Sequence, residues 1–160
     1  SMLNRNFVVV GSKKNSSGVA EPMWMEVNIS GAVLQAHSIN MGVAAAFTEV
    51  SRARYGGFVL TGHSGTGVAA RVNESLQLIW SKKLNSFLYG GHQATDSSFW
   101  LVGMKPTNPD SIKFMHLSKT GQDMGEHQIQ MNSININQYF FPVCVLQYLA
   151  LQKLHPDFQN

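Results

Sequence analysis

Short apolar segments closed by glycine recur along the chain, and they predict a protein built of β-strands. Three such segments are Phe7–Gly11, Phe58–Gly62 and Phe99–Gly103, and each is followed by a polar loop and a second apolar-rich segment. The apolar segments are rich in β-branched and aromatic residues and are separated by Gly, Asn and Ser, a pattern that favours strands over helices. The sequence therefore predicts an all-β fold.

The turns that follow the second strands are evenly spaced. Gly31, Leu76 and Gly121 lie 45 residues apart, whereas the loops that precede them vary in length. A constant spacing with variation confined to loops is typical of a structural repeat.

We therefore expect one domain over residues 1–160, made of repeat units at about 6–40, 41–85 and 86–130. Three strands are evident in each unit. A fourth is expected in each gap between units, at 46–53 and from Phe87 onward. The tail, 131–160, is expected to complete the first unit, with a strand within 134–151, or to form a short helix.

Two of the strand segments are apolar at every position. Phe7–Val10 and Phe99–Val102 lack the alternation of a strand with one solvated face. We therefore expect both faces of these strands to be buried, as happens when sheets stack face on face.

The middle unit resembles a known family. Gly-Gly-Phe-Val-Leu-Thr-Gly at 56–62, Ala-Ala-Arg-Val-Asn-Glu-Ser at 69–75 and Leu-Gln-Leu-Ile-Trp-Ser-Lys-Lys at 76–83 are similar to the tandem β-propeller repeats of bacterial proteins. The resemblance covers roughly residues 6–130 and implies four-stranded blades that end in a docking tryptophan.

The flanking units depart from this pattern at two positions. Gln35 and Gly125 stand where the middle unit has Trp80, and Leu76 stands where the other units have glycine.

Three blades are too few for a ring, because propellers close with four to eight. Each bare stacking face would cover about 300 Å², and its burial would be worth about 8 kcal/mol. We therefore expect a homodimer that closes a six-bladed ring. The alternative is a monomeric β-trefoil, since three units of four strands also describe that fold.

The composition agrees with a single domain that associates. The 160 residues are 44% hydrophobic and only 13% charged, which excludes intrinsic disorder. We expect a soluble protein, because neither a signal peptide nor a membrane span is evident. The same observation weakly favours the cytoplasm as its compartment. The single cysteine, Cys144, lies in an apolar stretch and is expected to be an inert, buried thiol.

No complete catalytic or cofactor motif is present. The glycines of 62–67 have the spacing of a phosphate-binding loop, but Val68 and Ala69 occupy the positions of its lysine and hydroxyl residue. The six histidines lack the short spacings of zinc ligands. We therefore expect no cofactor, no metal and no catalytic residue, and the modest net charge of +3 weighs against a nucleic-acid partner.

Four polar residues fall on or beside the expected innermost strands. Arg52, Arg54, His92 and Gln93 would line the mouth of a ring, where the family resemblance implies a ligand site. The prediction is a non-enzymatic binding or assembly module with an unknown ligand. The alternatives are a propeller-type hydrolase or lyase with its site at the ring mouth, and a β-trefoil carbohydrate-binding protein.

Overall fold

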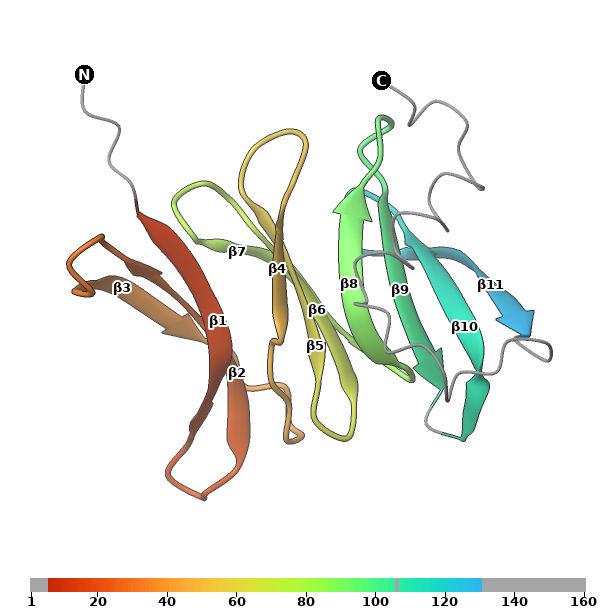
Figure 1. The fold of residues 1–160 in the computed structure, drawn as a ribbon, viewed down its shortest axis with the longest axis horizontal. Coiled ribbons are helices and arrows are strands. Elements are labelled where there is room, and N and C mark those ends of the chain that lie inside the picture. The colour runs from red at the N-terminus through yellow and green to blue at the C-terminus, as the bar shows by residue number, and fades with distance from the viewer. Residues whose placement is uncertain (1–5, 106, 131–160) are drawn as a thin grey trace, which may run out of the picture.

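Three separate antiparallel sheets lie side by side in chain order (Figure 1). The structure, a computed structural model, describes residues 6–105 and 107–130. The first sheet contains β1 (Phe7–Lys14), β2 (Ala20–Val27) and β3 (Val33–Ser38). The second contains β4 (Glu49–Arg52), β5 (Phe58–His63), β6 (Gly67–Val72) and β7 (Leu78–Leu84). The third contains β8 (Phe87–Gln93), β9 (Phe99–Lys105), β10 (Asn108–Leu117) and β11 (Asp123–Gln130).

Each strand pairs with the next strand along the chain within its sheet. All the regular structure of the described residues is β-strand, which confirms the expected all-β fold class. Within the same residues, no helix is long and apolar enough to cross a membrane.

The hairpins β2–β3, β6–β7 and β10–β11 share one local geometry. Gly31, Leu76 and Gly121 all have a positive φ, of 82°, 60° and 80°. In the second sheet, the Asn73 amide donates to the carbonyl of Gln77, and the Leu76 amide donates to the carbonyl of Asn73, both at 3.0 Å. The other two turns have the same pair of backbone hydrogen bonds. The same local structure therefore recurs every 45 residues.

A tryptophan from one sheet docks on the turn of the next. The Trp24 indole donates to the carbonyl of Leu76 at 2.8 Å, and the Trp80 indole donates to the carbonyl of Lys119 at 3.2 Å. Leu76 replaces glycine because its side chain fills the core beneath Trp24, despite the strained φ. Gly121 has to remain glycine, because a Cβ there would lie 2.8 Å from the Trp80 ring.

The second sheet is buried on both faces. Val59 and Ala69 belong to the core shared with the third sheet, whereas Leu60 and Ala70 belong to the core shared with the first. We call these two cores the second interface and the first interface. Neighbouring residues of a strand point to opposite faces, so β5 and β6 are the strands that need apolar residues at successive positions.

The expectation that Phe7–Val10 is buried on both faces is wrong. Phe7 and Val9 are 56% and 42% exposed, while Val8 and Val10 pack against the first interface. The reason is that the first sheet ends the stack, and no other described sheet packs on its far face. In β9, Phe99 and Leu101 are buried, but Trp100 and Val102 are only half-buried.

Both expected gap strands are present, but the first sheet has three described strands rather than four. β4 and β8 fall in the gaps between the units and form edges of the second and third sheets. No described strand precedes β1 in the first sheet, because the described chain begins directly before it. The predicted strand or helix within 134–151, and Cys144, lie outside the described residues.

The glycine-rich segment at 62–67 is a β-hairpin. Gly62 is the last residue but one of β5, which ends at His63, and Gly67 begins β6. A Cβ on Gly62 would collide with the carbonyl of Ala46, and one on Gly67 with the carbonyl of Ser86. These glycines therefore permit close packing of the backbone, and this packing explains their presence without a phosphate-binding role.

Candidate functional site

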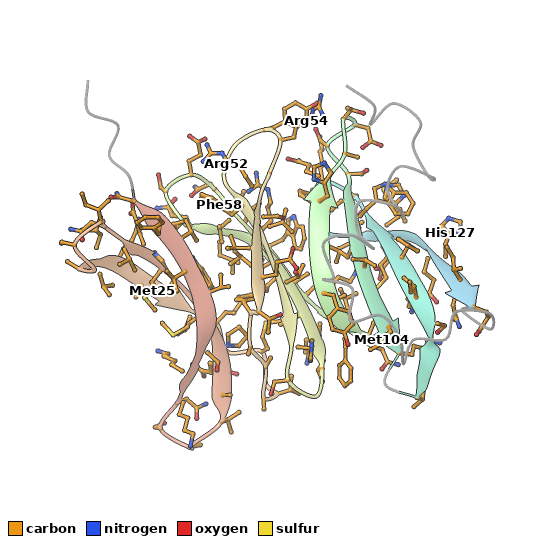
Figure 2. All side chains as sticks on the ribbon, viewed as in Figure 1. Met25, Arg52, Arg54, Phe58, Met104 and His127 are labelled. Atoms are coloured by element: carbon orange, nitrogen blue, oxygen red, sulfur yellow. The ribbon has the colours of Figure 1, made fainter. Side chains whose placement is uncertain are left out.

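The four residues predicted to form a site are divided between two places. Arg52 ends β4 and lies in a cavity with residues of the first sheet. Arg54 lies two residues further on, toward the end of β8 that carries His92 and Gln93 (Figure 2). The two arginines therefore belong to two different groups of residues.

The first group joins two neighbouring loops. Gln93 is buried, and its side chain accepts a hydrogen bond from the Tyr55 amide and donates one to the carbonyl of Ser97, both at 3.3 Å. The Tyr55 hydroxyl donates to the carbonyl of Thr95 at 2.5 Å. Gln93 thus joins the loop after β4 to the loop after β8, and both the oxygen and the nitrogen of its side-chain amide are used in these hydrogen bonds.

His92 lies beside this loop junction on β8. Burial lowers the pKa of His92, and the positive charge of Arg54 lowers it further. The imidazole is therefore held in its neutral form over more of the pH range than an exposed histidine.

Arg52 belongs to a cleft between the first and second sheets. The cleft has a volume of about 340 Å³ and is lined by Asn6, Val8, Glu26, Arg52, Phe58, Glu74 and Leu76. The Arg52 guanidinium donates to the Glu74 carboxylate at 3.0 Å and lies 5.4 Å from the centre of the Phe58 ring (Figure 2). Both side chains of this ion pair are 68% exposed, so the pair forms a solvated rim.

Glu26 forms the wall of the cleft that belongs to the first sheet. Its carboxylate accepts hydrogen bonds from the side chains of Gln35 at 2.7 Å and Asn6 at 2.6 Å. The hydrogen bond from Gln35, and next that from Asn6, lowers the pKa of Glu26. Glu26 is therefore an ionised group at neutral pH.

The sequence prediction missed Glu26 and Glu74. Neither lies near Arg52 along the chain, so no local motif joins them. One signal was present, since Glu26, Arg71 and His116 share one position in the 45-residue spacing, where each interrupts an apolar strand. A titratable residue that recurs at one position of the repeat, among apolar neighbours, indicates a space between the sheets that can hold a polar group.

The cleft presents an ionised carboxylate rather than a group that could act as a general acid. A general acid needs a carboxyl group whose pKa is raised, whereas the pKa of Glu26 is lowered and Glu74 is paired with Arg52. The formal charge of the three groups is −1. Elsewhere in residues 6–105 and 107–130, no three His, Cys, Asp or Glu side chains are grouped so that they could hold a metal ion.

Comparison with known proteins gives evidence on the fold alone. No protein-family model matches the chain, and no curated protein matches it. A solved structure of a protein of unknown function from Bacteroides caccae is similar, with a TM-score of 0.51 and 10% sequence identity. The match covers 80% of this chain and 42% of that one, so the chain spans less than half of its structural neighbour.

Proposed function

We propose that this chain is a non-enzymatic binding or assembly module of the β-propeller type, and that a second copy closes its ring. The three sheets would be three of six blades, with β4 and β8 as innermost strands. Among the described residues no strand pairs with a strand of another sheet. This supports stacked blades over a β-trefoil, in which strands of different units pair to close one barrel.

The observation that carries the proposal is an uncovered face of the first sheet. Val9, Leu60 and Leu101 each lie two residues before the glycine that closes their apolar segment. Leu60 and Leu101 are 0% exposed because each packs on the preceding sheet, whereas Val9 is 42% exposed. The outer face of the first sheet is therefore as apolar as the buried faces of the other two sheets, but no described sheet covers it.

We call this surface the open face, and it extends across two strands. Met25 of β2 (Figure 2) pairs with Val9, Val27 pairs with Phe7, and Met23 pairs with Gly11, so all six positions share one side of the sheet. Burying a face of this size is worth about 8 kcal/mol. Apolar patches of several hundred Å² on soluble proteins mark interaction sites.

The third sheet of a second copy would be the partner of the open face. In the proposed ring, the third sheet of one copy would precede the first sheet of the other. The turn at Gly31 has room for this contact, because nothing lies near its Cβ position, whereas the equivalent turn at Gly121 is in contact with Trp80 of the preceding sheet. On the side of the third sheet that faces away from the second, His116 stacks on Trp100 with the ring centres 4.2 Å apart. Packing the third sheet of each copy on the open face of the other makes two identical junctions, which close a ring.

The mass of the intact chain in solution tests this proposal. Light scattering should give the mass of two chains, and Val9→Lys with Met25→Lys should reduce it to one, because two charges would be buried at the junction. Val19→Lys is the matched control, since Val19 is exposed in the loop before β2. A stable, non-aggregating wild-type chain with the mass of one copy would overturn the proposal.

A further inference from the structure

The two interfaces place opposite charges at equivalent positions. Glu26 and Arg71 lie 45 residues apart, and each comes immediately before the register shift of its hairpin. Both face the following sheet, since Glu26 lines the cleft beside Phe58 and the Arg71 guanidinium lies 5.9 Å from the centre of the Phe99 ring. Phe58 and Phe99 in turn are the first residues of the equivalent strands β5 and β9.

At the second interface, a guanidinium group fills the space beside the phenylalanine. Arg71 is buried and donates to the backbone carbonyls of Phe58, at 3.2 Å, and of Val72 and Gly56. Carbonyl oxygens and the face of an aromatic ring are both favourable surroundings for a cation. This site is a cation-binding site occupied by the protein's own side chain.

At the first interface, the equivalent space has a carboxylate on its wall and is open. Glu26 is ionised and takes part in none of the ion pairs of the described residues. Arg52 reaches Phe58 from the solvated rim, where it is already paired with Glu74. The cleft of about 340 Å³ lies at the lower end of the volumes of small-molecule sites.

We propose that this cleft binds a small organic cation with a guanidinium or primary ammonium group. The cationic group would pair with Glu26 and lie beside Phe58, and its alkyl chain would pack on the partly buried Val8. The net charge of −1 favours a cation over an anion, and the occupied second interface supports the guanidinium class. This inference rests on the binding role proposed above, but it does not need the ring, because every lining residue belongs to one chain.

Calorimetric titration of the full chain with butylguanidinium chloride tests the site. Butylurea is the matched neutral probe, since it has nearly the same shape without the charge. We expect saturable binding of butylguanidinium and at least tenfold weaker binding of butylurea. Equal affinity for the two probes, or no binding of either, would overturn the proposal.

Two variants with opposite expected effects locate the binding in this cleft. Glu26→Gln should weaken binding about tenfold, which corresponds to the loss of one charge-assisted hydrogen bond. Arg52→Gln should strengthen binding, because it removes a competing cation from Phe58 and Glu74. Glu21→Gln makes the same charge change at the other end of β2 and should leave the affinity unchanged; a loss equal to that of Glu26→Gln would contradict the site.

The outcomes of this titration and of the mass measurement are independent. A chain with the mass of one copy that still binds butylguanidinium through Glu26 would refute the ring and support the cleft. A two-chain particle that does not bind the probe would do the reverse.

Discussion

The two interfaces between the sheets have the same architecture and differ in how they accommodate charge. In both, a tryptophan docks on the turn of the next sheet and a phenylalanine begins the facing strand. The second interface encloses Arg71 among backbone carbonyls, whereas the first keeps Glu26, Arg52 and Glu74 around an open cleft.

This difference follows from the cost of removing a charge from water. Burial lowers the pKa of Arg71, which is the sign of a desolvated cation. The carbonyl acceptors and the Phe99 ring offset that cost, so the charge becomes part of the structure. The charged groups of the first interface are exposed to solvent, so a ligand can reach them.

Replacing Arg71 should have the largest effect on stability. Arg71→Met fills part of the space but leaves the carbonyls of Gly56, Phe58 and Val72 without this donor. We expect a loss of about 3 kcal/mol in the free energy of unfolding, measured by urea denaturation. Arg54→Met, at an exposed position, should change it by less than about 0.5 kcal/mol. A loss below about 1 kcal/mol for Arg71→Met would show that the buried cation is not structural.

The paired turn glycines should differ by a smaller amount. Gly31 and Gly121 have nearly the same φ, so alanine costs about 1 kcal/mol at either position from backbone strain alone. Gly121→Ala also brings a Cβ to 2.8 Å from the Trp80 ring, which should add about 1–2 kcal/mol. Denaturation of the two variants measures the difference, and equal losses would mean that the Trp80 contact contributes nothing.

The sequence was sufficient to predict β1, β5 and β9, because each contains a short apolar segment closed by glycine. The spacing of Gly31, Leu76 and Gly121 also located three turns that share one geometry. It did not predict which strands are buried on both faces, since Phe7–Val10 and Phe58–Leu60 are equally apolar. Burial depends on the place of a sheet in the stack, and local composition carries no information on that order.

The site was harder to predict than the fold for a related reason. Arg52, Arg54, His92 and Gln93 do lie on or beside β4 and β8. However, Arg52 lies in the cleft with residues of the first sheet, whereas Arg54 lies close enough to His92 of β8 to affect its charge. Glu26 comes from another sheet altogether, and only the packing of the sheets brings it to Phe58.

The dependence of stability on pH should separate the two interfaces, with the smallest effect of the three. His92 has a lowered pKa in the folded chain, so below its ordinary value of about 6.5 the unfolded chain binds more protons. Stability should therefore fall as the pH decreases from about 6.5 toward the folded pKa of His92. Glu26 also has a lowered pKa, but its contribution is complete above the ordinary value of 4.5 and is lost only below it.

Denaturation midpoints measured from pH 7.5 to 3.5 distinguish these two windows. His92→Gln should flatten the part of the curve that begins at about pH 6.5, whereas Glu26→Gln should alter only the part below about pH 4.5. Arg54→Gln should flatten the first window partly, because burial is the larger cause of the shift in His92 and Arg54 the smaller. If His92→Gln left the curve unchanged just below pH 6.5, proton binding at the β4–β8 junction would not contribute to stability. The contrast between a closed second interface and an open first one would then have to rest on Arg71 alone.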